Sequence, residues 1–284
     1  MIDPVIADSL HTNVAKVAQE ENIGKAIMDH VTNGNELHLP FLHIHLPHFE
    51  PVSFLGITID FSISNHLIML WVAGLIMIFL FVWAYNKKKM IPTGITAFLE
   101  ILVIFVRDEI AVPNLGEKLG KLLTPLILNF FFFILILNLI GLIPLFTTAT
   151  GNISVTAGLA LITFVVMIGM GIKENGFIGY LKSLIPSGVP IVFAPLMFVV
   201  EFIGLFTKPF ALTVRLFANM TAGHVVILSF ITLIMVFKTI AIAPISVGFA
   251  LFINVLELLV AVIQAYIFAL LSAMFIGMAA HPSH

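Results

Sequence analysis

The sequence lacks cysteine altogether, and charged residues make up only 10% of its 284 positions. Without cysteine, the chain can form neither disulfide bonds nor thiolate metal sites. A soluble domain usually carries about 25% charged residues, so the low charge content argues against a water-soluble protein. Basic stretches with interleaved aromatic residues are also missing, and we therefore expect no nucleic-acid partner.

Apolar residues account for 60% of the chain. They come in blocks of about twenty, long enough to cross a bilayer core of about 30 Å. This pattern predicts an all-α polytopic membrane protein with about five to six membrane-embedded helices. The first residues, MIDPVIADSL, lack the basic and apolar regions of a cleavable signal peptide, so we expect the internal spans to direct insertion.

Residues 1–65 are predicted to form an extracytoplasmic segment of mixed polarity. An amphipathic helix is plausible near 14–31, and extended, proline-rich chain follows it. The segment contains a group of histidines that could bind a metal: His38, His43, His45 and His48. Their spacing is extended rather than helical, and no HExxH motif accompanies them. A solvated or interfacial loop is the preferred interpretation, and we expect no metal or cofactor.

The membrane domain is predicted to cover residues 66–280. Three lysines at 87–89 directly follow its first apolar block, and a lysine cluster at the end of a span marks the cytoplasmic side. This orientation puts the N-terminus outside and the C-terminus in the cytoplasm. The predicted elements are a span at 66–85, an interfacial amphipathic helix at 93–121, spans at 122–146 and 153–172, and two long helices at 191–237 and 245–280.

The two last apolar blocks are too long to be upright spans. As a single helix, 191–237 would measure about 70 Å, more than twice the thickness of the bilayer core. Such a helix either turns near the sequence NMTAG or lies strongly tilted and curved in the membrane. The pattern of residues does not choose between these two arrangements.

Polar residues form one stripe on each of these two long helices. Four of them in the first helix share a face, because their spacing is seven, seven and four residues. They are Glu201, Lys208, Arg215 and Asn219. In the second helix, a similar stripe contains Asn254, Glu257, Ala261 and Gln264. Packed antiparallel, the helices would form a hydrated seam with Arg215 and Glu257 on it or near it.

Arg215 is the most informative of these residues. An arginine in the middle of a span costs roughly 2.5–3.5 kcal/mol on insertion scales, so intramembrane charges are usually functional or paired. The alternative is a structural ion pair between Arg215 and Glu257 without a transport role. We favour the functional interpretation.

The other polar residues also have structural interpretations. Glu201 and Lys208 could be groups near a helix end that reach toward the membrane interface. Asn219 and Gln264 could simply hydrogen-bond neighbouring helices together. His224 could be a core histidine, although an imidazole is also suited to proton relay.

A fixed cation among proton carriers would act as a barrier or a displacer, because arginine does not deprotonate at physiological pH. A carboxylate on another protein, brought to about 4 Å from Arg215, would be attracted by about 4 kcal/mol at an effective dielectric constant of 20. It would release its proton there and take one up elsewhere. Splitting the proton path on either side of an arginine would couple the membrane potential to movement of that carboxylate.

At these residues the sequence resembles the a subunit of F-type ATP synthases. The resemblance lies in KPFALTVRLFANMTAGH at 208–224 and in ELLVAVIQAYIFALLSAMFIGMA at 257–279. LILNLIGLIPL at 135–145 and LFTTATGNISVTAGLAL at 145–161 are also similar to segments of that family. The match runs from about residue 66 to 280, whereas the N-terminal residues carry no motif of the family.

The resemblance implies a stator subunit of the F0 sector, not catalytic alone, which translocates protons in a bacterial inner membrane. It implies a long, tilted helical hairpin that faces a rotating ring of c subunits, with a b-subunit stalk, the rest of the F1F0 complex and membrane lipid as further partners. Arg215 would face the ring carboxylate, and Asn219 and Gln264 would line the proton path. Glu201 would belong to one of two half-channels.

One pair of residues departs from the commonest bacterial pattern of this family. In that pattern, the position of His224 is a glutamate and that of Glu257 a histidine; here they are exchanged, as in mitochondrial relatives. If the two sites are close in space, the exchange retains one acid and one imidazole. We therefore expect them to act as a pair in the half-channel open to the outside, with the order of proton transfer left open.

Two alternative functions were weighed. A secondary transporter could use Arg215 to bind an anionic substrate, but such proteins usually show repeated halves, and the sequence has none. An intramembrane enzyme with a histidine metal site would need ligands at helical spacing within a span, which are also missing. The choice between protons and sodium ions stays open at this stage, because the carrier site would lie on the partner ring.

Overall fold

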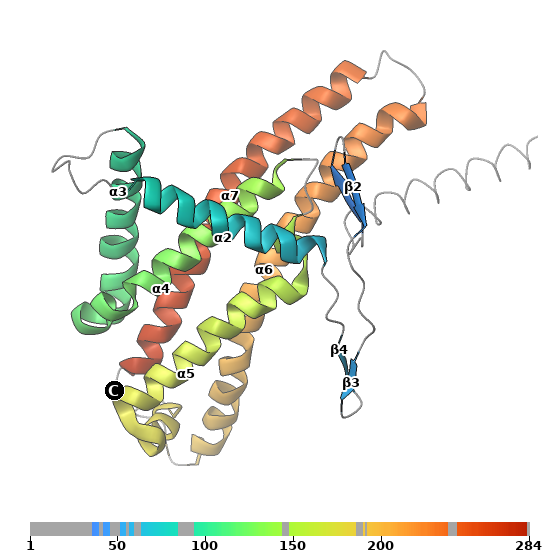
Figure 1. The fold of residues 1–284 in the computed structure, drawn as a ribbon. Helices are drawn as coiled ribbons and strands as arrows, with labels where there is room; N and C mark the ends of the chain where they lie inside the picture. Colours follow the sequence, from blue (N-terminus) through green and yellow to red (C-terminus); the bar gives the residue numbers. More distant parts are fainter. Residues whose placement is uncertain are drawn as a thin grey trace, which may run out of the picture. The chain divides into compact units, whose positions relative to one another are not determined.

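The computed structural model describes residues 36–39, 42–45, 52–54, 57–59, 64–84, 94–143, 148–185, 190, 192–237 and 243–282. The chain forms two compact units. The smaller unit combines Met1–Asn65 with Thr221–Glu257, and the larger unit combines His66–Met220 with Leu258–His284. Figure 1 shows the helices and strands along the chain. The helix expected near 14–31 lies outside the described residues.

Five helical segments within the described residues are long and apolar enough to cross a membrane. The prediction of a helical, polytopic membrane protein is thereby confirmed. In chain order the helices are α2 (Asn65–Ala84), α3 (Ile95–Phe105), the π-helical segment η1 (Val106–Ala111), α4 (Val112–Gly141), the 3-10 turn η2 (Ala149–Gly151), α5 (Ile153–Ser183), α6 (Ala194–Phe237) and α7 (Ala243–Ala280).

Two short antiparallel hairpins lie in the N-terminal segment, where the sequence predicted extended chain. Strand β1 (Glu36–Leu39) pairs with β2 (Leu42–His45), and β3 (Val52–Phe54) pairs with β4 (Ile57–Ile59). In the first hairpin, His38 lies directly opposite His43, and His45 lies opposite Glu36. His48, the fourth histidine of the group, is outside the described residues.

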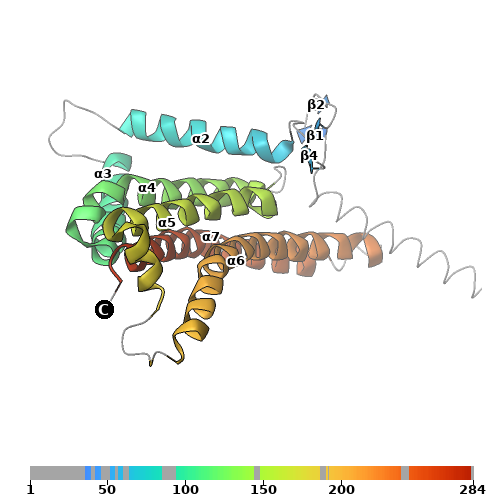
Figure 2. The same ribbon diagram turned by 90° about the horizontal axis from the view of Figure 1, so that it is seen from below.

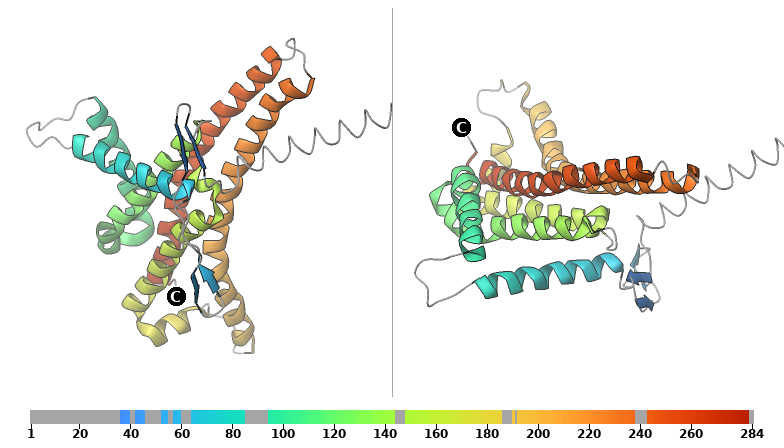
Figure 3. Two further views of the ribbon diagram at one scale, coloured as in Figure 1. Left: turned by 45° about the vertical axis from the view of Figure 1, so that its right-hand side comes forward. Right: turned by 90° about the horizontal axis from the view of Figure 1, so that it is seen from above.

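Within the larger unit, the helices lie in three layers (Figures 2 and 3). Helix α2 forms one layer, α4 and α5 form the next, and α6 and α7 form the third. Pairs of aromatic rings join neighbouring layers. Ring centroids are 4.9 Å apart for Phe81 and Phe132, 5.4 Å for Phe130 and Phe268, and 5.4 Å for Phe164 and Phe206.

Small side chains on α7 explain how it packs closely in this unit. Ala261, Ala265, Ala269 and Ala273 are spaced four residues apart, and each is at most 2% exposed. A stripe of small residues lets helix backbones approach each other, which is the usual basis of helix association in membranes. The hydroxyl groups of Thr163 on α5 and Ser272 on α7 are hydrogen-bonded at 3.1 Å along the same contact.

Two glycines break long helices of the larger unit. Gly116 in α4 has φ 75° and ψ 168°, and Gly176 in α5 has φ 72° and ψ 162°. Glycine adopts positive φ without steric cost, so each helix changes direction there. The break in α4 falls at Gly116, ahead of the boundary predicted between the interfacial helix and the following span. That the part before Gly116 lies at the interface stays a prediction.

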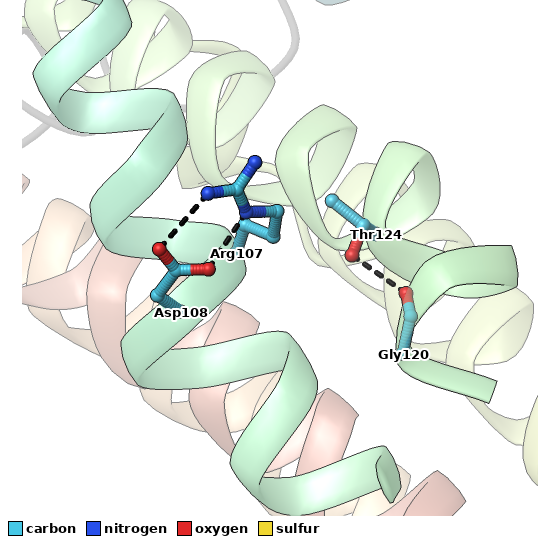
Figure 4. Close-up of polar contacts among 4 residues, drawn as sticks. All are labelled: Arg107, Asp108, Gly120 and Thr124. Atoms are coloured by element: carbon cyan, nitrogen blue, oxygen red, sulfur yellow. Dashed lines mark hydrogen bonds and ion pairs between the residues drawn. The ribbon is translucent and has the colours of Figure 1, made fainter. Parts of the chain in front are cut away.

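The charges in this part of the chain agree with an aqueous or interfacial setting. Arg107 in η1 pairs with its neighbour Asp108, with Nε donating to Oδ1 at 2.7 Å and Nη2 to Oδ2 at 3.0 Å (Figure 4). Their side chains are 51% and 47% exposed.

In the following helix, α4, the Thr124 hydroxyl donates a hydrogen bond to the Gly120 carbonyl at 2.6 Å, so the hydroxyl has its partner within its own helix.

The C-terminal end of α7 is held between α4 and α5. The Asn175 side-chain amide donates to the carbonyl oxygens of Ala279 and Ala280, at 3.3 and 3.1 Å. These are carbonyls of the last helical turn, which otherwise lack partners within the helix. On the other side, a side chain at Gly277 would collide with the backbone carbonyl of Asn114. The end of the last helix is therefore fixed in position.

Candidate functional site in the paired helices α6 and α7

Helices α6 and α7 run antiparallel in both units, which is the arrangement considered for the two polar stripes. In the larger unit, Lys208 Nζ lies 5.8 Å from the centre of the Phe275 ring, and Asn219 Nδ2 donates to Gln264 Oε1 at 3.0 Å. In the smaller unit, the rings of Phe230 and Phe249 stack with centroids 5.5 Å apart. Later residues of α6 thus pair with earlier residues of α7.

Helix α6 contains 44 residues and continues through NMTAG without a break. Of the two arrangements considered for this segment, the turn at NMTAG is therefore wrong. At 1.5 Å per residue, a helix of this length measures about 66 Å. Pro209 lies inside the helix, and Figure 2 shows a bend in its gold, early part within the larger unit. Proline is the usual cause of such a bend, because it removes a backbone hydrogen bond.

Arg215 lies at the border between the packed and the open side of α6. Its neighbours Leu212 and Leu216 are 2% and 1% exposed and face the core, whereas Phe210 and Val214 are 66% and 36% exposed. The Arg215 side chain is partly buried. Among the described residues of the larger unit, its guanidinium has no hydrogen-bond or ion-pair partner.

The open side of α6 beside Arg215 is mostly apolar. Exposed residues recur along it at helical spacing: Phe206, Phe210, Val214 and Ala218. On α7 of the same unit, Leu259, Val262 and Ile263 are also exposed, by 43–59%. We call these seven residues the open face. Apolar residues exposed on a membrane helix must meet either lipid or another membrane protein.

Glu257 belongs to the smaller unit and is almost completely buried, with 6% exposure. Its carboxyl group lies against the backbone of Gly223, the residue before His224; a Cβ at that glycine would be 2.6 Å from the carboxyl carbon. Neither carboxyl oxygen has a hydrogen-bond partner among the described residues of the unit, and the same is true of the buried Thr221 hydroxyl. Buried polar atoms without protein partners are places where ordered water is expected.

Glu201 and Lys208, at the other end of the first stripe, line a cleft of about 430 Å³ in the larger unit. We call it the C-terminal cleft. Its other polar residues are Tyr180, Ser183 and His281. Arg215 and Asn219 do not line it. Of the stripe predicted from helical spacing, Glu201 and Lys208 therefore line this cleft, whereas Asn219 takes part in the contact of α6 with α7.

Tyr180 and His281 were missed by the sequence reasoning. Helical periodicity relates only residues of one helix, whereas the cleft is completed by α5 and by the end of the chain beyond α7. The sequence carried no local signal that would bring these residues to Glu201. In contrast, the contact between Asn219 and Gln264 joins two residues that the stripes had already singled out.

A family model described as ATP synthase A chain matches residues 67–277 of this sequence. The chain belongs to the ATP synthase A chain family. The match covers both polar stripes and all of the helices described above except the ends of the first and the last. It confirms the resemblance inferred from the motifs around Arg215 and identifies the chain as a membrane subunit of the F0 sector of an ATP synthase.

Relatives in the ATP synthase A chain family support this conclusion. The chain is 50% identical to ATP synthase subunit a of Chloroherpeton thalassium over 262 residues, which cover 90% of this chain and 77% of the relative. It is 49% identical to ATP synthase subunit a of Myxococcus xanthus over 229 residues, 80% and 75% of the two chains. For the subunit of Pelodictyon phaeoclathratiforme, the identity is 44% over 294 residues, 99% and 85% of the two chains.

Proposed function

We propose that this chain is the stator subunit that couples transmembrane proton flow to rotation of a ring of c subunits. The observation that carries the proposal is the Arg215 guanidinium, which has no hydrogen-bond or ion-pair partner among the described residues of its own unit and borders the open face. A carboxylate on a neighbouring membrane protein would find it accessible from the open face.

The electrostatics of such a contact fit a rotary mechanism. Arginine stays protonated, so it cannot pass protons along and interrupts any proton path that reaches it. A carboxylate about 4 Å away would be attracted by about 4 kcal/mol at an effective dielectric constant of 20, which favours its ionised form. Each ring carboxylate therefore releases its proton on one side of Arg215 and takes up another on the other side.

We assign the two half-channels to the two groups of polar residues. The first contains Glu257 and His224; Asn219 and Gln264, a hydrogen-bonded pair of the larger unit, are also assigned to the proton path. The buried, unpartnered carboxyl of Glu257 supports this assignment, because such a group calls for water or a mobile proton. The second contains Glu201 and opens through the C-terminal cleft, which holds two of the three charged residues of the first stripe, Glu201 and Lys208.

The partners follow from the same surfaces. The open face fits the c-subunit ring, because it is apolar and borders the arginine. The b-subunit stalk, the rest of the F1F0 complex and membrane lipid would cover other parts of the helices. We place the chain in a bacterial inner membrane, with the N-terminus outside and the C-terminus in the cytoplasm, on the basis of its lysine distribution.

The test is ATP-driven proton pumping by membrane vesicles that contain the whole complex with Arg215→Ala. We expect pumping to fall to background, because the ring carboxylates would no longer be held ionised at one point. ATP hydrolysis by the detached F1 sector should be unchanged. Lys182→Ala, which removes an exposed cation from α5, serves as the matched control and should pump normally.

Normal coupled pumping by Arg215→Ala would refute the mechanism. A loss of pumping in both variants would point to a general defect of assembly. Immunoblotting of the chain in the membrane separates that case from a specific role of Arg215.

A further inference from the structure

The C-terminal cleft is built by three parts of the chain. Helix α5 contributes Tyr180 and Ser183, α6 contributes Glu201 and Lys208, and the end of the chain contributes His281. Helix α6 thus places one carboxyl and one ammonium group on the walls, and α5 adds two hydroxyl groups. The third part adds an imidazole, and none of the functions assigned above uses it.

His281 is held in place although it lies just beyond the last helix. Its backbone N–H donates to the Gly277 carbonyl at 2.8 Å. The two residues before it have their carbonyls bound by the Asn175 amide. On the side of α4, the imidazole Nε2 lies 3.9 Å from the position that a Cβ of Gly116 would occupy. The histidine is therefore part of a fixed wall.

His281 is exposed at the surface of its unit while it also lines the cleft. It thus lies between the surface of the protein and the space that Glu201 lines. The titratable groups that share the cleft are Glu201, Lys208 and Tyr180. Near Gly116, the neighbouring helices add Glu117 and an ion pair in which Lys118 Nζ lies 4.0 Å from Glu174 Oε2.

We propose that His281 is the proton-exchange residue at the mouth of the C-terminal cleft, passing protons between bulk water and Glu201. This inference rests on the half-channel assigned to Glu201 above. An imidazole can take up a proton on one nitrogen and release one from the other near neutral pH, which lysine and arginine cannot do. The proton taken from water or buffer goes to water in the cleft and then to Glu201, so the imidazole returns to its starting state.

The physical need for such a group is greatest when free protons are scarce. In weakly buffered medium at alkaline pH, the delivery of protons to a narrow opening limits the flow. A fixed imidazole at the opening collects protons from water and from passing buffer molecules. Concentrated mobile buffer in the medium should make it dispensable.

The test uses His281→Gln, which keeps a polar side chain of similar reach but removes the titrating group. In inverted vesicles with the whole complex, we expect the initial rate of membrane-potential formation during ATP hydrolysis to fall severalfold in weakly buffered alkaline medium. Concentrated imidazole in the medium should restore the rate. Pro282→Ala, which alters the neighbouring residue of the same wall, should behave like the unmodified protein in both media.

Three outcomes decide the matter. An unchanged rate for His281→Gln in weak buffer would overturn the proposal. A reduced rate that imidazole does not restore would overturn it as well, because it would indicate a structural role. A normal rate for Glu201→Gln would refute the half-channel itself, whereas a reduced rate for that variant together with a normal rate for His281→Gln would refute only the role of His281.

Discussion

Glu257 illustrates how a single residue depends on a neighbour that has no side chain. Its carboxyl group occupies the space that a Cβ of Gly223 would fill, and it is 6% exposed. Any larger residue at position 223 would push the carboxyl away from α6. The glycine thus determines how closely the acid approaches the turn that carries His224.

At the residue scale, Gly223→Ala should therefore reduce ATP-driven pumping strongly. The added methyl group overlaps the Glu257 carboxyl, and forcing extra atoms into a packed site costs about 1–3 kcal/mol. Gly248→Ala is the matched control in the same unit, because no atom lies within 4 Å of its Cβ position. Equal pumping by the two alanine variants would show that the contact between Gly223 and Glu257 does not matter for proton transfer.

At the scale of elements, α5 is fixed against the end of α7 by close packing around a second glycine. A Cβ at Gly171 would lie 2.7 Å from Tyr180 Cδ2 and 3.1 Å from the Ala279 carbonyl oxygen. Tyr180 is 5% exposed and forms part of the cleft wall. Because Gly176 bends α5 between these two residues, the tyrosine ring folds back onto the helix from which it comes.

Gly171→Ala should therefore destabilise the packing of α5 on α7 by about 1–3 kcal/mol. The measurement is the thermal stability of the purified complex in detergent, followed by loss of this chain from the complex. Gly169→Ala, two residues earlier on the same helix, meets nothing within 4 Å and should not lower the stability. If both variants denature at the same temperature as the unmodified complex, the close packing around Gly171 does not determine the thermal stability of the complex.

At the scale of the whole molecule, α5 connects the two sides of the membrane. Its straight part, from residue 153 to the break at Gly176, measures about 35 Å, close to the thickness of the bilayer core. Lys173 and Lys182 lie near one end, and the Asn152 side chain caps the other end by accepting from the Ser154 backbone N–H at 2.8 Å. The positions of the lysines predict that the former end lies in the cytoplasm.

The absence of cysteine makes this orientation easy to test, since a single introduced thiol is the only one on the chain. A membrane-impermeant thiol reagent should label Lys182→Cys in inverted vesicles and Ser154→Cys in right-side-out vesicles. Both positions are exposed. Labelling of the two variants in the opposite vesicles would reverse the topology and move the C-terminal cleft to the outer side.

The sequence by itself determined the membrane class, the polar stripe on each of the two long helices and the family. Each of these depends on residue type and helical spacing, which act locally along the chain. It also singled out Arg215, because an isolated cation in an apolar run is costly wherever the helix lies. A contact between Asn219 and Gln264 could also be anticipated, because helical spacing places each of them on the polar stripe of its helix.

Only the tertiary structure decided the unbroken course of α6, the breaks at Gly116 and Gly176, and the walls of the C-terminal cleft. A glycine in a helical pattern is compatible with either a straight helix or positive φ, and the neighbouring helices select one of them. Tyr180 and His281 line the same cleft as Glu201 because Gly176 bends α5 and the end of α7 is clamped by Asn175. Contacts between distant parts of a chain depend on how the helices pack, and the spacing of residues within one helix does not predict that packing.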